Sequence, residues 1–334
     1  FEGAKKIVSL GGIYNTWRIA SIPLDNSITI CDSCVSLYSK SKRRGKFKWF
    51  DITNSEPVTN IYPLKSIQST QANVTPLNIV YTPARRGTYN YNGSYESIAD
   101  KSTTWNGIMK YLNTSSNDLL NENINFIEFS MQIFKGDSAG VGKLVIDLGN
   151  VSQDVIPNDI VDTEDTLRSG NLQSINDDLG MDFLNDEGEK NLWRALNPGI
   201  DPPDDPALDN FKSTTNDPDY DAINGTQGNA NSDAGRKPDT EDLNKTNNVR
   251  NGNDYFQYEV NLDIVDNPYV VGVGKEGWRQ YKIPLSEFRK KYGSAVFTNI
   301  QFVRLWVTGV NDSVSLKLYE INLTGNQWVK QIKT

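Results

Sequence analysis

The chain has 334 residues, 37% of them hydrophobic and 10% aromatic, which is enough for two ordinary domains or one large β-domain with an insertion. Its net charge of −8, without a basic stripe carrying interleaved aromatic residues, argues against nucleic acid as a partner. Histidine is absent, which removes the commonest general base and the imidazole metal ligand, so we expect no enzyme. The sequence has no run of about 18 apolar residues, so we expect no transmembrane helix.

Residues 1–157 are predicted to form a β-sandwich. Polar and apolar residues alternate in short runs, which is typical of strands with one buried face. The predicted strands are residues 6–10, 17–22, 46–52, 126–134 and 143–148. Within residues 104–112, a helical spacing of apolar residues predicts one short amphipathic helix, formed around Trp105, Ile108, Met109 and Leu112.

Residues 158–254, called the acidic segment below, break this pattern. Eight basic residues against 22 carboxylates give the segment a net charge of −14, whereas 26 basic and 20 acidic residues give the rest of the chain +6. Such asymmetry predicts either disorder or a bound positive species, most simply a divalent cation. Helical turns are predicted at residues 171–175 and 187–196, the second with Asn185 or Asp186 as its N-cap.

Residues 255–334 again predict strands, at 255–264, 278–284, 300–309 and 314–323. Residues 278–288 predict a strand followed by a short helix, and their sequence resembles that of galactose-binding-like jelly rolls. This part forms either a second β-sandwich unit or the remaining strands of the first. The expected fold class is therefore mainly β, with jelly-roll sandwich units joined by an acidic, partly helical connector.

Carboxylates gather in three clusters of the acidic segment, at residues 177–189, 217–225 and 239–244. Calcium takes about 6–8 oxygen ligands, so closely spaced carboxylates are a simple way to surround it. The second cluster opens like a calcium loop, but Ala222 and Gly228 replace the Gly and Glu of an EF-hand. The candidate calcium ligands are Asp178, Asp182, Asp186, Asp217, Asp219, Asp221, Asp239, Glu241 and Asp242. The alternative is that these side chains cap their own backbone turns.

Cys31 and Cys34 form a single C-x-x-C pair, the candidate for a local disulfide or two inert thiols. A zinc site would need two more Cys or His ligands, which the chain lacks. Seven tryptophans are candidate sugar platforms, although tryptophan in alternating strands more often belongs to the core. Nothing singles out one carboxylate pair for glycoside hydrolysis.

Many short sequence segments, or phrases, resemble the SprA/Sov family in the same order along the chain. This family is the outer-membrane translocon of the type IX secretion system. Among them are RGKFKWF at residues 44–50 and WRQYKIPLSEF at residues 278–288. The others are at residues 1–3, 17–23, 86–91, 105–109, 125–131, 148–155, 176–180, 224–229, 238–244 and 302–306. Because the acidic segment carries several of these phrases, we expect it to be ordered. The chain corresponds to a small fraction of such a translocon, so it looks like a domain cut from a longer parent.

The resemblance implies a non-catalytic role in protein export to the cell surface and in gliding motility. The family forms a β-barrel conduit whose partners are PorV-type proteins, a plug protein and secreted cargo, besides other parts of the barrel. The expected location is the extracellular face of the outer membrane, as a cap, rather than the periplasmic face. The alternative function is a calcium-stabilised carbohydrate-binding or adhesin module, and a third is a secreted hydrolase. A sugar module predicts an exposed strip of aromatic side chains.

Overall fold

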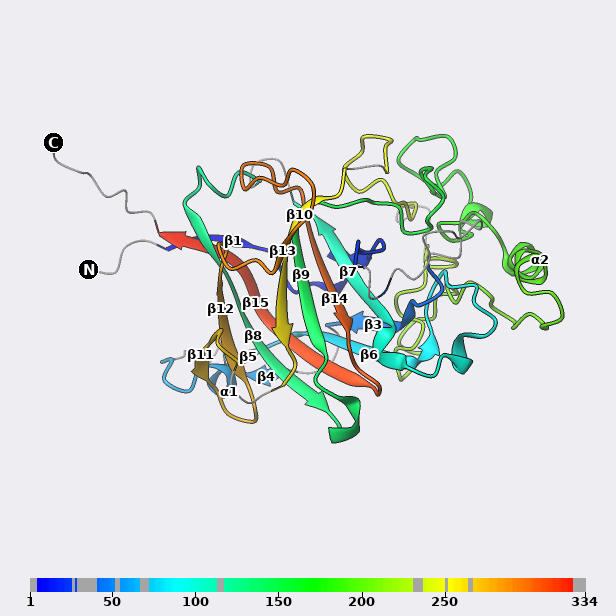
Figure 1. Cartoon of the computed structure of the whole chain (residues 1–334). Coiled ribbons are helices and arrows are strands. Elements are labelled where there is room, and N and C mark those ends of the chain that lie inside the picture. Colours follow the sequence, from blue (N-terminus) through cyan, green and yellow to red (C-terminus); the bar gives the residue numbers. More distant parts are fainter. Residues whose placement is uncertain are drawn as a thin grey trace.

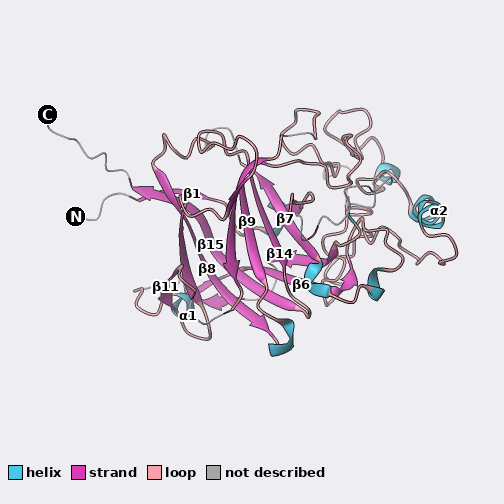
Figure 2. Ribbon diagram, viewed as in Figure 1, coloured by secondary structure: helices cyan, strands magenta, loops and turns pink. Residues whose placement is uncertain are grey.

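The computed structural model describes residues 5–25, 28, 41–51, 55–66, 72–112, 117–230, 237–249, 252–263 and 267–326. Two antiparallel sheets lie against each other as the layers of a sandwich (Figures 1 and 2). A single hydrophobic cluster contains side chains from both layers, for example Ile127 and Leu316 from one and Ile146 and Leu305 from the other. None of the helices in the described ranges is long and apolar enough to cross a membrane.

The first sheet has the strand order β11–β12–β8–β15–β6–β3, and β1 pairs with β15. Its strands are Val270–Val273 for β11, Arg279–Pro284 for β12, Ile124–Lys135 for β8, Val314–Asn326 for β15, Leu77–Arg86 for β6, Gly45–Phe50 for β3 and Lys5–Ser9 for β1. Strands β4 (Glu56–Pro57) and β5 (Asn73–Val74) form a separate two-stranded sheet, and helix α1 (Val58–Ile61) directly follows β4.

The second sheet has the order β13–β10–β9–β14–β7–β2. Its strands are Lys290–Lys291 for β13, Asp254–Asn261 for β10, Lys143–Asn150 for β9, Phe302–Thr308 for β14, Trp105–Tyr111 for β7 and Arg18–Ile19 for β2. Strand β14 is buried along both faces. On one face, Arg304 forms a fully buried ion pair with Asp147 of β9 at 2.8 Å. A buried ion pair of this kind ties neighbouring strands together, since removing either partner would leave a charge in the core.

Strands from both halves of the chain alternate within each sheet. In the first sheet β12 pairs with β8, and β15 lies between β8 and β6. In the second sheet β14 lies between β9 and β7. Residues 255–334 therefore contribute strands to the same sandwich as residues 1–157, rather than forming a second one.

The acidic segment connects two neighbouring strands, β9 and β10, which pair with Asn150 opposite Asp254. It lies beyond one end of the sheets, as green and yellow loops around α2 (Figure 1). Helix α2 spans Asp186–Leu196, and its N-cap Asn185 accepts a hydrogen bond from the Gly188 amide, as predicted. The segment is thus an insertion in a hairpin position of one sandwich.

Every strand predicted from alternation is present, with ends that differ by no more than three residues. The helix predicted at residues 104–112 is wrong, because this stretch is strand β7. Both faces of β7 are buried, so its apolar residues do not alternate and their spacing imitates a helix. Residues 171–175 form no helical turn apart from the start of a 3-10 turn, Ile175–Asp177. Residues 285–286 form a turn, and no helix follows the strand at residues 287–288. Cys31 and Cys34 lie outside the described residues.

Candidate metal centre in the acidic segment

Carboxylates hold the acidic segment together by accepting hydrogen bonds from distant backbone amides. The segment has little regular structure, so its buried amides need partners that strands or helices would otherwise provide. Glu241, which is 1% exposed, accepts through one oxygen from the amides of Val155 and Ile156, each at 2.7 Å. Its other oxygen accepts from the amide of Asp162 at 3.1 Å. Glu241 thereby joins the late part of the segment to its start.

Glu164 acts in the same way from the other direction. Its two oxygens accept from the amides of Gly180 at 2.8 Å and Asp239 at 2.7 Å. Burial, followed by the negative charge of Asp239, raises the pKa of Glu164 to about 8. Both carboxylates thus connect parts of the chain that are far apart in sequence. We call Glu241 and Glu164 the carboxylate clamps.

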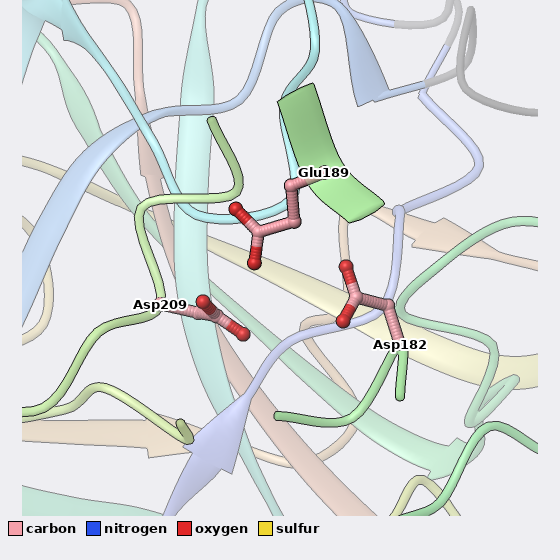
Figure 3. A group of neighbouring side chains, drawn as sticks. All are labelled: Asp182, Glu189 and Asp209. Atoms are coloured by element: carbon pink, nitrogen blue, oxygen red, sulfur yellow. The ribbon is translucent and has the colours of Figure 1, made fainter. Parts of the chain in front are cut away.

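Three other carboxylates, Asp182, Glu189 and Asp209, come together in a group that we call the triad. One oxygen of each lies within 4.8 Å of the others, and Figure 3 shows the three carboxyl groups facing one another. Glu189 belongs to the first turns of α2, which Asn185 fixes as its N-cap. Gly180 has φ +82°, and a Cβ there would lie 2.1 Å from Asp209 Oδ2. Only glycine therefore lets the Asp209 carboxylate approach this turn.

The triad is only partly satisfied by hydrogen bonds. The Tyr91 hydroxyl and the Leu184 amide donate to Asp182, each at 3.1 Å, and the Ala207 amide donates to Glu189 at 2.8 Å. The hydroxyls of Tyr89 and Thr226 donate to one and the same oxygen of Asp209, at 2.9 and 3.2 Å. Glu189 Oε1 and Asp209 Oδ1 have no partner among the described residues, although both side chains are 0% exposed. Buried carboxylate oxygens without a donor are costly, so these two atoms call for an explanation.

Electrostatics at the triad favours protonation or a counter-charge. Burial raises the pKa of Asp209 to about 9, and the charges of Asp182 and Glu189 add to the effect. Burial likewise raises the pKa of Glu189 to about 7 and that of Asp182 to about 6. Asp186 and Asp205 contribute further negative charge around Glu189. The site thus concentrates negative charge where water does not screen it.

Arg86 is a cation near the triad, and its side chain is committed elsewhere. Its Nη1 donates to the carbonyls of Asn90 and Pro206, and its guanidinium lies 4.8 Å from the ring centroid of Trp193. None of the ion pairs found in the described part of the chain joins Arg86 to Glu189 or another triad member.

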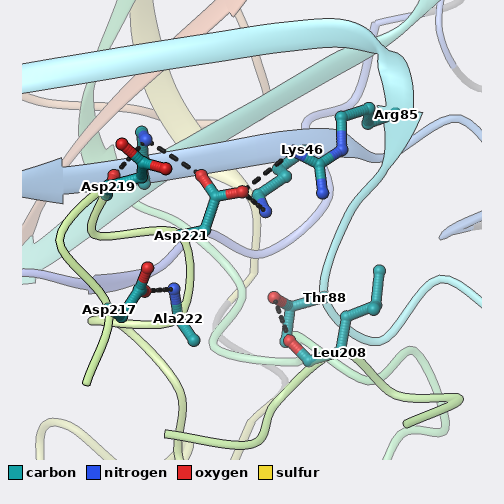
Figure 4. Close-up of polar contacts among 9 residues, drawn as sticks. Lys46, Arg85, Thr88, Leu208, Asp217, Asp219, Asp221 and Ala222 are labelled. Atoms are coloured by element: carbon teal, nitrogen blue, oxygen red, sulfur yellow. Dashed lines mark hydrogen bonds and ion pairs between the residues drawn. The ribbon is translucent and has the colours of Figure 1, made fainter. Parts of the chain in front are cut away.

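The second predicted cluster does not form a common site. Asp221 makes ion pairs with Lys46 at 2.8 Å and with Lys48 and Arg85 at 2.9 Å each (Figure 4). Although partial burial opposes ionisation, these three cations hold the pKa of Asp221 well below its usual range. Asp217 caps the Ala222 amide at 2.6 Å. The backbone carbonyl of Asp219 accepts from the Lys48 ammonium.

The other predicted ligands also have protein partners. Asp178 accepts from the amides of Gly228 and Ala230 at 2.8 and 2.7 Å, and Asp186 accepts from the Asn210 side chain at 3.0 Å. Asp239 accepts from the Asn229 side chain, and Asp242 from the amides of Thr246 and Asn247 at 2.9 Å each. Of the nine predicted ligands, the structure brings Asp182 alone into the triad. Glu189 lies in the first cluster without being chosen as a ligand, and Asp209 lies outside all three.

The tryptophans within the described ranges are core residues. Six of the seven lie within the described ranges, and all are at most 5% exposed: Trp17, Trp49, Trp105, Trp193, Trp278 and Trp306. Trp105 and Trp306 pack edge to face with ring centroids 6.3 Å apart. The strip of exposed tryptophan expected of a sugar-binding module is absent from the described part of the chain.

Part of the chain matches a known protein family. The SprA_N family, described as motility related/secretion protein, matches residues 204–334. No curated protein matches the chain. Among solved structures, the family 11 carbohydrate-binding module of the cellulosomal cellulase Lic26A-Cel5E of Clostridium thermocellum is similar at 10% identity and a TM-score of 0.34, covering 99% of this chain and 100% of that one. At that score the likeness supports no statement about binding.

Fold and site together define a mainly β, jelly-roll-type sandwich with a carboxylate-clamped insertion between two strands. The residues matched by the family include the last part of this insertion and every strand from β10 onward. Residues 204–334 thus match a family of motility-related and secretion proteins, which supports the resemblance of the sequence to the SprA/Sov family.

Proposed function

We propose that this chain is a non-catalytic, extracytoplasmic domain of an outer-membrane translocon of the type IX secretion system, acting as an extracellular cap. The observation that carries the proposal is the family match at residues 204–334. Strands β10, β12, β14 and β15 come from the matched residues and pair with β6, β7, β8 and β9 of the unmatched part. Because matched and unmatched strands are interleaved in both sheets, we infer that the whole sandwich folds as one unit with the matched part.

A structural rather than catalytic role agrees with how the acidic side chains are used. Glu241, Glu164 and Asp178 accept backbone hydrogen bonds through both oxygens, which leaves them poorly suited to proton transfer. The role would be to support export and gliding motility through contacts with the barrel, PorV-type and plug partners and passing cargo.

Domain deletion in cells tests the role in export. Residues 5–326 are replaced by a short flexible linker in the parent protein, and the level of the parent in outer-membrane fractions is measured together with secretion of type IX cargo. We expect cargo secretion and gliding to fall while the parent remains in the membrane. Full cargo secretion by a parent that is present at its normal level would refute the proposal.

Location is tested separately with an epitope inserted between Leu64 and Lys65. Leu64 is fully exposed at 100%, so an insertion there disturbs no packing. A cap on the cell surface predicts antibody labelling of intact cells. Labelling that requires permeabilised cells would place the domain on the periplasmic side and refute the cap.

A further inference from the structure

The geometry points to a calcium site at the triad of Asp182, Glu189 and Asp209, where the ion holds the acidic segment closed. This inference goes beyond the proposed function, since it concerns how the insertion is stabilised. The donor set is all carboxylate oxygen, without nitrogen or sulfur, which suits a hard cation. Two oxygens on opposite sides of Ca²⁺ are about 4.8 Å apart at the usual ligand distance of about 2.4 Å. The triad oxygens lie within that separation.

The two oxygens without partners distinguish this group from Glu241 and Glu164. Glu189 Oε1 and Asp209 Oδ1 belong to side chains that are 0% exposed, and no described donor reaches either atom. At the clamps, by contrast, both oxygens of Glu241 and of Glu164 accept backbone amides. A cation would satisfy the free oxygens and neutralise the mutual repulsion of the three carboxylates.

The other oxygen of Glu189 and of Asp209 is fixed by hydrogen bonds. The Ala207 amide fixes Glu189 Oε2, and the hydroxyls of Tyr89 and Thr226 fix Asp209 Oδ2, at 2.9 and 3.2 Å. These donors fix the carboxylates through one oxygen and leave the other oxygen of each available to a cation, as outer partners do around metal ligands.

The ligands also come from three separate parts of the acidic segment. Asp182 lies in the turn after Gly180, and Glu189 lies in helix α2. Asp209 lies in the loop after this helix, 20 residues beyond Glu189. A bound ion would therefore close two loops at once. Such an ion acts as a cross-link, and its removal should loosen this part of the chain while leaving the sheets intact.

Two variants test the site in the purified 334-residue chain. Asp209→Asn and Glu189→Gln each keep the oxygen that has a donor and replace the unpartnered oxygen with an amide NH₂. Both remove a charge from a buried acidic group, so we expect folded proteins whose melting temperature in EDTA equals or exceeds that of the chelated wild type. Glu187→Gln is the matched control, since Glu187 lies in the same helical turn but is exposed, with 67% of its side chain accessible.

Binding is measured by calorimetry with Ca²⁺ and by Tb³⁺ luminescence excited through tyrosine, since Tyr89 and Tyr91 contact two of the ligands. We expect Tb³⁺ emission that Ca²⁺ displaces, and a melting temperature that Ca²⁺ raises relative to EDTA. Asp209→Asn and Glu189→Gln should weaken Ca²⁺ binding about tenfold or more, whereas Glu187→Gln should change it by less than about twofold.

Two outcomes would overturn the inference. One is a wild-type chain that gives neither heat nor displaceable emission at millimolar Ca²⁺, which would mean that the triad is satisfied by shared protons. The other is unchanged binding in both triad variants, which would place any ion elsewhere. Neither outcome bears on secretion, so the inference and the proposed function can fail independently.

Discussion

Truncation of Glu241 is the most direct test of the carboxylate clamps. Glu241→Ala removes a side chain that accepts from the amides of Val155, Ile156 and Asp162. Val155 and Ile156 are 2% and 1% exposed, so their amides lose their partner inside the protein. An unsatisfied buried amide costs about 1–3 kcal/mol. Water entering the space and the loss of a buried carboxylate beside Asp162 offset part of this, so we expect about 2–4 kcal/mol of destabilisation.

The amide variant separates hydrogen bonding from charge. Glu241→Gln retains an oxygen for Val155 and Ile156 and places an NH₂ opposite the Asp162 amide. It also removes a charge that burial disfavours, because burial raises the pKa of Glu241 well above its usual value. We therefore expect a loss of only about 1 kcal/mol.

Asp242→Ala is the matched control. Its carboxylate also accepts two amides, those of Thr246 and Asn247, but in an exposed turn where water can replace it. The expected cost is about 1 kcal/mol or less. Urea unfolding followed by tryptophan fluorescence, with limited proteolysis to detect local opening, measures all three variants. If Glu241→Ala and Asp242→Ala differed by less than about 0.5 kcal/mol, the clamp reasoning would be refuted.

Further predictions concern the core, pH and glycans. Arg304→Met leaves Asp147 charged and unpaired in the sandwich, so it should lower the free energy of unfolding in urea by about 3–5 kcal/mol. The double variant Arg304→Met/Asp147→Leu should recover much of this loss, and equal stability of the single and double variants would contradict the reasoning. Burial raises the pKa of Glu164 to about 8, so its folded form binds a proton more tightly than the unfolded chain. Its contribution is therefore complete below the unfolded value near 4.5 and is lost as pH rises through about 8. In EDTA, Glu164→Gln should flatten the fall in unfolding free energy over that window, and an unchanged slope would show that other groups cause it. Because the described tryptophans are buried, a glycan array should show no saturable binding, and a specific glycan hit would revive the adhesin alternative.

Local signals in the sequence predict the elements whose formation is local. Helix α2 is found because Asn185 caps it, Pro198-Gly199 follows it and its apolar residues face one side. Strands with one buried face are found through alternation. Strand β7 is missed because both of its faces are buried. Strand β6 receives no prediction because Pro83 lies inside it, and proline argues against a strand interior.

Contacts between distant residues account for what the sequence could not predict. Strand β12 lies beside β8 across about 150 residues, so the two β segments read as separate units although they share both sheets. Asp209 shows the same limit at the site. It lies 27 residues after Asp182, outside every carboxylate cluster, and reaches the triad only because the loop folds back past Gly180.

The net charge of −14 therefore divides into groups that differ in how they are compensated. Carboxylates such as Glu241 are stabilised by neutral backbone amides, which supply hydrogen bonds but no opposite charge. Asp221 is compensated by three cations of the sandwich, at the boundary between insertion and sheet. The triad has neither full hydrogen bonding nor an ion pair among the described residues. If the sequence were acidic only to cap turns, its least satisfied carboxylates would lie at the surface, where water serves them. Here Glu189 and Asp209 are fully buried and face each other, which is the arrangement that a small cation stabilises and that solvated turns do not need.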